Sequence, residues 1–514
     1  MLLLEAGPDY PDIEHLPEEL KLGYATATDI MVSDHNWQFI GRTTDTAEPM
    51  LVPRGKVTGG SSAINGQVFL RGVPEDYDMW ASLGNDQWSF EKLLPYFRKL
   101  ETDTDVHDDF HGTDGPIIAR RFRRDEWLPA QSAFYNACKA YGSPDSPDHN
   151  GPDSSGVGPT PYNNPRGIRW STALGYLDPT RHRLNLTIRP ECIVHRIPFD
   201  GKRATGVVVE SGGEAFTVEG EQIVLSGGAV ASPQLLMLSG VGPADHLRGL
   251  GIPVVIDLPG VGQNLRDHPI VSVTWRTRDG FELDGVAPRS QLSLRYTTQG
   301  SELRNDMILI MASFATERIN RGGDRMKPLG IRMTVGLYLA LGSGEIRLTS
   351  TDPNVQPFLD YNYLQEPFDR QRMREGVHLC LELDQHGDFQ DIIEERIEPT
   401  DAELESDEAL DAWLLREATT GQHISCTCKM GPASDPMAVV DQFGRVLGLE
   451  GLRVVDASIM PDCIRANTNV TTIMIGERIT DFMRRGSYRA RRAHATPVSR
   501  GLATPQGGSG LLRR

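Results

Sequence analysis

The chain has 514 residues, of which 39% are hydrophobic and 24% are charged, so it is long enough for two or three domains with buried cores. Its 52 basic and 70 acidic side chains give a formal charge of −18, which disfavours nucleic acid as a partner because the phosphates would be repelled. Apolar runs such as Met307 to Ala315 are too short to cross a bilayer, and the first residues do not resemble a signal peptide.

Cysteine usage indicates thiols rather than a disulfide framework, because six cysteines are few for a chain of this length. Cys426 and Cys428 lie two residues apart, but zinc needs four ligands at characteristic spacings. We therefore expect buried free thiols, no metal site, a reducing compartment and a cytoplasmic protein.

The opening stretch MLLLEAG predicts a short buried strand that ends in Glu5. A carboxylate in this position is typical of nucleotide-binding sheets, which present an acid to a ribose hydroxyl about 20 residues after a glycine-rich phosphate turn. No such turn precedes Glu5 in this sequence. Either the strand is a plainer one, or the natural chain begins earlier.

The next informative stretch is PRGKVTGGSSAINGQVFLRG, residues 53–72. Its small residues expose backbone N–H groups that can approach a phosphate or a flat ring closely, although a plain turn is an equally simple interpretation. Further on, Ser89 is a candidate N-cap for the helix FEKLLPYFRKLE, which Pro95 is expected to kink or interrupt.

Strands and helices then follow one another to the end of the chain. Residues 186–225 alternate in polarity as short strands do, and a helix is predicted from Ser232 to a glycine stop at Gly240. Residues 345–363 predict strand and turn, and residues 370–383 predict an amphipathic helix.

The last chemically suggestive segments are HISCTCKMGPASDP, which contains His423, and VVDASIMP, a strand that ends in Asp456. Asn467 and Asn469 precede an apolar helix whose N-terminus would direct positive partial charge at an anion. Each feature has a structural alternative, since a lone histidine is often a core residue and an asparagine is often a helix cap.

Together, these segments resemble the glucose-methanol-choline (GMC) family of FAD-dependent oxidoreductases in content, order and spacing. MLLLEAG resembles the family's second Rossmann strand, GAVASPQLLMLSGVG its second signature, and GKVTGGSSAIN its first signature with Thr58 in place of an apolar residue. Weaker matches such as VGQNLRDHP extend the resemblance over nearly all of residues 1–483. The ending CIRANTNVTTIMIGERI resembles the choline-dehydrogenase-like bacterial branch and members associated with the mycofactocin redox cofactor.

The resemblance implies a two-lobed α/β fold. One lobe would be a Rossmann-like FAD-binding domain without its N-terminal glycine-rich βα unit, and the other an α+β substrate-binding domain built on an antiparallel sheet. The segments that we assign are 1–75, 184–265 and 418–484 to the FAD-binding domain, 76–183 and 266–417 to the substrate-binding domain, and 485–514 to a disordered basic tail.

The activity that the resemblance implies is oxidation of an alcohol by hydride transfer to the flavin N5. By position, His423 is the base, and a neutral imidazole with a pKa of about 6.5 can accept a proton near pH 7. Asn467 holds the second position of the catalytic pair, where an amide cannot act as a base but can hydrogen-bond the substrate oxygen.

The resemblance also implies the cofactor contacts: the adenosine ribose at Glu5, adenine at Val194, and the pyrophosphate, ribityl chain and flavin ring along the remaining positions. Those positions are Gly59, Gly60, Ser61, Ser62, Asn65, Gly66, Gln67, Val68, Asp456, Ala457 and Thr468. Some members attach FAD through a histidine in the signature loop, but this loop reads Ala63-Ile64-Asn65, so non-covalent FAD is expected.

Several alternatives stay open at this point. The sequence does not identify the alcohol, and it favours a quinone or another carrier over oxygen as electron acceptor. A lyase of the same family that binds FAD without net redox chemistry is a second possibility. A third is an inactive remnant, if the glycine-rich unit is genuinely lost; we expect instead a natural start about 30 residues earlier, one βα step.

Overall fold

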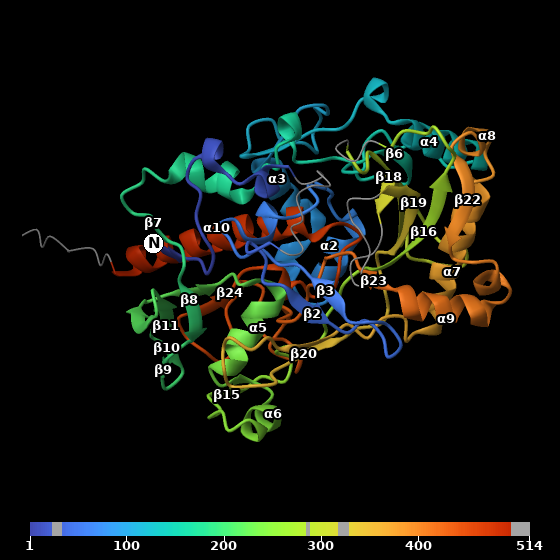
Figure 1. The fold of residues 1–514 in the computed structure, drawn as a ribbon. Coiled ribbons are helices and arrows are strands. Elements are labelled where there is room, and N and C mark those ends of the chain that lie inside the picture. Colours follow the sequence, from blue (N-terminus) through green and yellow to red (C-terminus); the bar gives the residue numbers. More distant parts are fainter. Residues whose placement is uncertain (23–32, 284–287, 317–327, 495–514) are drawn as a thin grey trace, which may run out of the picture.

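The computed structural model describes residues 1–22, 33–283, 288–316 and 328–494, with side chains as far as residue 485. Two lobes are visible in Figure 1, one built on a large antiparallel sheet and the other on short strands around helix α5 (Gly228–Leu238). The long helix α10 (Thr468–His494) runs across the molecule. The predicted two-lobed α/β class, with an antiparallel sheet in one lobe, is confirmed.

The large sheet has the strand order β22-β16-β19-β18-β17-β6, and β23 also pairs with β16. All of its pairs are antiparallel, with Ile308 opposite Gly336 at the centre of the β18–β19 ladder. Its strands are β6 (Gly156–Pro159), β16 (Pro269–Thr277), β17 (Leu292–Tyr296), β18 (Met307–Thr316), β19 (Pro328–Leu337), β22 (Ile393–Glu398) and β23 (Thr419–Thr420).

Helices cover this sheet, and close packing is visible at Gly376 of α7. A Cβ added there would lie 2.4 Å from Val335 Cγ1 on β19, so a side chain at this position would force the helix away from the sheet. The helices of this lobe are α4 (Pro129–Tyr141), α7 (Pro367–Leu383), α8 (Gly387–Gln390) and α9 (Asp407–Glu417).

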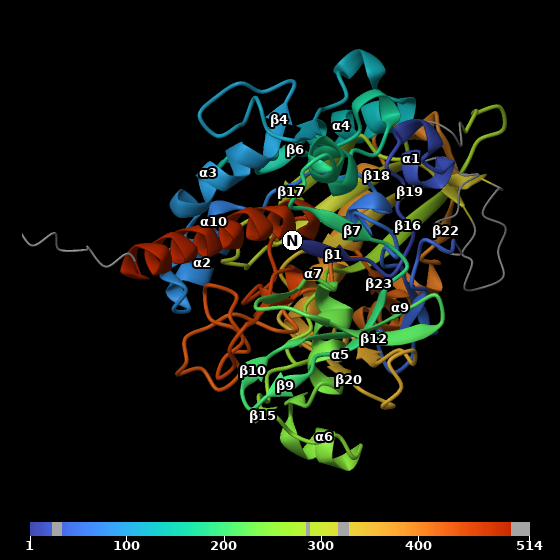
Figure 2. The ribbon, with the colours of Figure 1, turned by 90° about the vertical axis from the view of Figure 1, so that its left-hand side faces the viewer.

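The parallel strand pairs of the other lobe include β1 (Leu2–Leu4) with β7 (Thr187–Arg189) and β13 (Ile223–Leu225) with β24 (Leu452–Val454). Figure 2 shows β1 next to β7 and close to α10. A small antiparallel sheet of order β12-β11-β8 stands beside them. Its strands are β8 (Ile193–Arg196), β11 (Gly206–Ser211) and β12 (Glu214–Glu219). These strands agree with the alternation predicted for residues 186–225.

The remaining α-helices and β-strands lie outside these two sets. They are α1 (Glu18–Lys21), α2 (Pro74–Ser82), α3 (Phe90–Leu100), α6 (Ala244–Gly249), β2 (Phe39–Gly41), β3 (Met50–Val52), β4 (Glu101–Asp103), β5 (Ile117–Ala119), β9 (Phe199–Asp200), β10 (Arg203–Ala204), β14 (Val241–Gly242), β15 (Ile256–Asp257), β20 (Glu345–Arg347) and β21 (Phe358–Asp360).

Two predicted helices differ in detail because they contain proline. Helix α3 follows Ser89 as expected, but it runs through Pro95 to Leu100 without interruption. Helix α5 begins at Gly228, before the predicted start, and includes Pro233. Proline leaves the carbonyl four residues earlier without its helical donor, and here the Thr427 hydroxyl donates to that carbonyl, Ala229 O, at 2.7 Å.

The predicted disordered tail is corrected in its first part. Helix α10 continues to His494, so residues 485–494 are helical, and residues 495–514 lie outside the described residues. An ion pair between Arg485 and Asp481, one helical turn apart at 2.8 Å, supports this extension. Within the described ranges, neither the 27-residue α10 nor another helix combines the length and apolar composition that a bilayer span requires.

The core extends through both lobes, and all six cysteines lie in buried positions as free thiols. Burial raises the pKa of the thiols of Cys426 and Cys428 well above the ordinary value. The prediction of buried free thiols is therefore confirmed.

Candidate active site

A cavity of about 2280 Å³ is lined by residues of both lobes. Every candidate site residue that the sequence analysis named lies on its wall, although these residues come from six separate parts of the chain. They are Glu5, Gly59, Gly60, Ser61, Ser62, Asn65, Gly66, Gln67, Val68, Val194, His423, Asp456, Ala457, Asn467 and Thr468.

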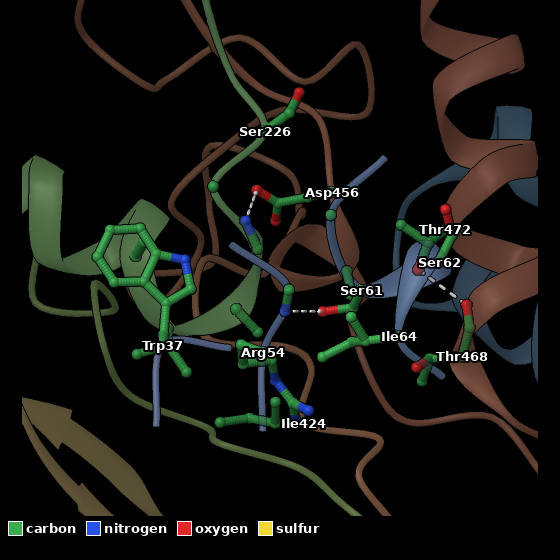
Figure 3. A pocket seen from close by; sticks show the side chains of 18 of the residues that line it. Trp37, Arg54, Ser61, Ser62, Ile64, Ser226, Ile424, Asp456, Thr468 and Thr472 are labelled. Carbon is green, nitrogen blue, oxygen red and sulfur yellow. Dashed lines mark hydrogen bonds between the residues drawn. The ribbon is translucent and has the colours of Figure 1, made fainter. Parts of the chain in front are cut away.

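The glycine-rich stretch forms a tight turn and a short 3₁₀ helix, Gly60–Ala63. Gly59 and Gly60 have φ values of 97° and 54°, a conformation that favours glycine. Ser61 Oγ accepts a bond from Gly55 N at 3.1 Å, whereas Ser62 Oγ donates to Gly59 O at 2.6 Å. Figure 3 shows Ser61 and Ile64 in the middle of the pocket, with Thr468 and Thr472 on one side and Trp37 on the other.

Asp456 holds two elements of the cavity wall together. Its carboxylate accepts bonds from Gly228 N at 2.9 Å, Ser232 Oγ at 2.6 Å and Ser458 N at 2.8 Å. Burial raises the pKa of this carboxyl group above its ordinary value. The carboxylate therefore fastens the end of β24 to the start of α5, and three of its acceptor sites are used within the protein.

Glu5 follows β1 directly, as predicted. Its Oε1 accepts a bond from Gly7 N at 2.9 Å, and burial raises the pKa of the carboxyl group to about 7. Val194 lies on β8, the strand that pairs with β11. At this end the cavity wall also includes the side chains of β1 and β13.

The opposite part of the cavity contains His423, whose two ring nitrogens both meet protein atoms. Nε2 lies 2.8 Å from Asn467 Nδ2, and Nδ1 lies 2.9 Å from Nδ1 of His268. Asn467 directly precedes α10, whereas Asn469 belongs to the helix itself, contrary to the prediction that it precedes it. Burial, with smaller contributions from His268 and Arg54, holds the pKa of His423 well below 6.5.

His268 and Asp267 support this histidine from behind. His268 Nε2 lies 2.8 Å from Ile464 O, and burial lowers its pKa to about 3. The neighbouring Asp267 accepts the backbone N–H of His423 at 2.7 Å and the hydroxyl of Tyr363 at 2.7 Å. The loop that carries His423 is thus fixed to the start of β16.

The cavity wall has unsatisfied groups that fit the FAD expected from the sequence. Four buried polar atoms on it have no partner among the described residues: Arg54 Nη2, Thr58 Oγ1, Gln67 Nε2 and Asn469 Nδ2. A Cβ added at Gly60 or Gly228 would meet nothing within 4 Å, so the backbone is open to the cavity at both glycines. Partnerless donors beside bare backbone suit a large ligand that carries phosphates and a polar ring.

Two side-chain clusters in the described part of the chain have metal-ligand composition. In the cluster Asp267, His268 and His423, the ring nitrogens bond one another or neighbouring protein atoms. In the cluster Glu101, Asp103 and His111, Arg71 pairs with Glu101, and Arg121 pairs with Asp103 at 2.9 Å. Arginine already neutralises the second cluster, so neither arrangement favours a resident metal.

Sequence reasoning missed His268, Asp267, Arg54 and Trp37 as parts of the site. The only available signal for the first two was their place in VGQNLRDHP, a stretch of the resemblance without a stated role. Arg54 lies on the cavity wall and belongs to the informative stretch 53–72, but no role was assigned to it there. Trp37 also lies on the wall, and nothing in its sequence neighbourhood indicated this.

Comparison with known proteins places this architecture in a family. Sequence models described as GMC oxidoreductase match residues 29–270 and 341–476. The oxygen-dependent choline dehydrogenases of Burkholderia thailandensis and Yersinia pseudotuberculosis are each 38% identical, over 94% of this chain and 89% of theirs. Pyridoxine 4-oxidase from Mesorbium loti matches with a TM-score of 0.84 and 26% identity over 96% of this chain and 94% of that one. A formate oxidase matches with a TM-score of 0.83 and 25% identity over 93% and 92%. The chain therefore belongs to the GMC oxidoreductase family and is an FAD-dependent alcohol oxidoreductase.

Proposed function

We propose that this protein oxidises an alcohol with His423 as general base and Asn467 as the group that orients the substrate oxygen. The observation that carries the proposal is the 2.8 Å separation between His423 Nε2 and Asn467 Nδ2 on the cavity wall. An alcohol oxygen placed beside both atoms could donate its proton to the imidazole and accept a bond from the amide. When bound, FAD supplies the hydride acceptor.

The environment of His423 suits a base. A pKa well below 6.5 keeps the ring neutral at pH 7, so Nε2 can hold a lone pair, to which Asn467 donates until the substrate hydroxyl takes its place. Proton transfer creates an imidazolium in a buried place, which costs free energy, but loss of the hydroxyl proton makes the carbinol C–H bond a better hydride donor. Asn467 at the start of α10 adds a donor beside the positive end of the helix, where an alkoxide is stabilised.

The cofactor would be held without a covalent bond. Glu5 would accept bonds from the adenosine ribose, and Val194 would contact adenine through its backbone. The turn at Gly59 and Gly60, with Gly228 across from it, would allow close approach of the pyrophosphate. Because the carboxylate of Asp456 is engaged by three protein donors, its contribution and that of Ala457 would come from the backbone. The remaining contacts would come from residues of the same wall, namely Ser61, Ser62, Asn65, Gly66, Gln67, Val68 and Thr468.

The same proposal divides the chain into two domains at the boundaries expected from the sequence. Residues 1–75, 184–265 and 418–484 would form the FAD-binding domain, and residues 76–183 and 266–417 the substrate-binding domain. The parallel pairs β1–β7 and β13–β24 in the first set, and the large antiparallel sheet mostly in the second, support this division.

A small polar alcohol related to choline is the substrate class that the relatives support, since two of them are named choline dehydrogenases. Trp37 and Phe39 stack with ring centroids 5.9 Å apart on the cavity wall, and Lys56 Nζ lies 5.0 Å from the centroid of the Trp37 ring, so this aromatic pair already holds a cation. The sequence favours a quinone or another carrier as electron acceptor, whereas the relatives' names mention oxygen. Oxygen uptake compared with quinone-dependent turnover separates these two acceptors.

The test is anaerobic mixing of the FAD-loaded protein with a panel of alcohols, followed by flavin absorbance. We expect bleaching by at least one alcohol, strong loss of bleaching in His423→Ala with FAD still bound, and normal bleaching in His246→Ala. His246 lies on α6, away from the cavity wall, and serves as a matched histidine control. Cyanohydrin cleavage without bleaching would instead identify a lyase, and equal bleaching in His423→Ala would remove the base assignment.

A further inference from the structure

We propose that His268 is a positioning residue that determines which ring nitrogen of His423 carries the proton. This inference rests on the proposed role of His423 as base. Its first support is geometric: His268 and His423 meet through their Nδ1 atoms at 2.9 Å, with ring centroids 5.0 Å apart and ring planes at 62°. Between two nitrogens at this distance, one must donate and the other must accept.

The far side of His268 decides which of its nitrogens carries hydrogen. Its Nε2 lies 2.8 Å from Ile464 O, and a carbonyl oxygen can only accept. Nε2 of His268 must therefore carry a hydrogen. The ring is completely buried and stacks on Tyr338 with the ring centroids 4.3 Å apart. Two backbone carbonyls act on its pKa, and the contribution of Ile464 is larger than that of Tyr338.

The charge around His268 decides whether Nδ1 carries a hydrogen as well. Burial is the main cause of a pKa of about 3, and the Arg266 guanidinium also opposes a positive charge. The ring is thus neutral, with hydrogen on Nε2 and a bare lone pair on Nδ1. Since that lone pair accepts, the donor at the 2.9 Å contact is Nδ1–H of His423.

This assignment leaves the lone pair of His423 on Nε2, the atom that faces Asn467. His423 is neutral, so a hydrogen on Nδ1 excludes one on Nε2. The amide nitrogen of Asn467 lies 2.8 Å from Nε2 and can donate to this lone pair, so the Asn467 contact is consistent with the assigned tautomer. The relay from Ile464 O through His268 therefore keeps the lone pair of His423 on Nε2, where Asn467 donates until the alcohol hydroxyl takes its place. The opposite tautomer would present a hydrogen there and could not act as a base.

Different residues hold the position of His423 and set its tautomer. The backbone N–H of His423 is held by Asp267 at 2.7 Å, whereas only the ring contact with His268 distinguishes its two nitrogens from behind. Ile464 also lies in the same loop as Asn467, three residues earlier, so one segment ends the relay and supplies the orienting amide. A change at His268 can thus alter the proton's location while the loop stays in place.

Two amide variants separate the two hydrogen bonds of His268. In His268→Asn, the amide oxygen can occupy the place of Nδ1 and still accept from His423, while the bond to Ile464 is lost. In His268→Gln, the amide nitrogen can reach the place of Nε2 and donate to Ile464, while the acceptor for His423 is lost. We expect kcat to fall tenfold or more in His268→Gln and less in His268→Asn, because a wrong tautomer has cost a histidine base as much as about 10⁴-fold in another enzyme.

The direct readout is the ring ¹⁵N spectrum of histidine-labelled protein, with the His423 signals assigned by their loss in His423→Gln. We expect a protonated Nδ1 and a bare Nε2 in the unsubstituted protein, the same state in His268→Asn, and a mixture in His268→Gln. His149→Gln removes another buried neutral histidine, one with a pKa of about 4, and is expected to leave the His423 signals unchanged.

The outcomes that would overturn the inference are distinct from failure of the base assignment. A hydrogen on Nε2 of His423 in the unsubstituted protein would contradict the relay, even if a variant failed to fold. Equal effects of His268→Asn and His268→Gln on the spectrum and on kcat would also contradict it. If His423→Ala bleached normally, the proposed function would fail while the tautomer measurement would still stand.

Discussion

The two ends of the cavity differ in how far the protein itself completes them. At the His423 end, His268, Asn467 and Asp267 satisfy the imidazole and its backbone, and the histidine is 8% exposed. At the Glu5 end, β1 and β13 each pair with one strand among the described residues, and Met1 and Val224 are 84% and 41% exposed. Chemistry needs geometry fixed before substrate arrives, whereas the Glu5 end, where we propose that the nucleotide binds, would take part of its contacts from the ligand.

The largest effect is expected when a side chain is introduced at Gly228, in the part of the cavity where we propose that FAD binds. Gly228 has a φ of 80°, and a side chain there would point into open space on the cavity wall. We expect Gly228→Val to strain the start of α5 and to weaken FAD binding by a factor of 100 or more. Flavin fluorescence titration measures this loss, and Gly249→Val, at an open position off the cavity wall, is the control. Unchanged affinity would show that the backbone at Gly228 does not approach the cofactor.

The His423 end can be weakened without removing its base. In Asn467→Ala, Nε2 of His423 loses its donor and the alkoxide loses its orienting amide. We expect kcat to fall by a factor of about 10 to 100, consistent with loss of one positioned donor, while FAD affinity changes little. Stopped-flow flavin reduction gives the rate, and a drop confined to KM would instead indicate a role in binding alone.

Much of this comparison could be predicted from the sequence, but not its supporting interactions. Glycine turns, strand ends and a helix start have local sequence signals, and the family resemblance, not the local signals, joined them into one site. His268 was missed because its role depends on a contact between the start of β16 and the loop that carries His423, 155 residues away in the sequence. The continuation of α10 beyond residue 484 was missed because this arginine-rich segment lacks apolar periodicity. The start of α5 was placed too late because the sequence around Pro233 does not show that Thr427, which is distant in the chain, donates to Ala229 O.

The raised pKa of Glu5 predicts that folding stability depends on pH. The folded pKa of Glu5 is about 7 against 4.5, so the folded chain holds a proton that the unfolded chain releases between these values. Folding stability therefore falls as pH rises from 4.5 to 7, by up to about 3 kcal/mol for this group. Glu5→Gln is expected to raise Tm at pH 8 but not at pH 4, and to weaken FAD binding. An unchanged Tm difference between the two pH values would contradict the raised pKa.

A smaller effect concerns the acid limit of catalysis. Because burial, His268 and Arg54 hold the pKa of His423 well below 6.5, the base stays neutral as pH falls through 6.5. We expect the rate of flavin reduction by alcohol to stay level through pH 6.5 and to decline only at lower pH. A decline centred at or above pH 6.5 would mean that the ring titrates as an exposed histidine does.

The central claim is that His423 takes the alcohol proton, and chemical rescue tests it most directly. In FAD-loaded His423→Ala, an alcohol should reduce the flavin far more slowly than in the unsubstituted protein. Added imidazole should restore part of the rate in proportion to its concentration, because the vacated space faces the cavity. Rapid flavin reduction in His423→Ala without any added base would contradict the account.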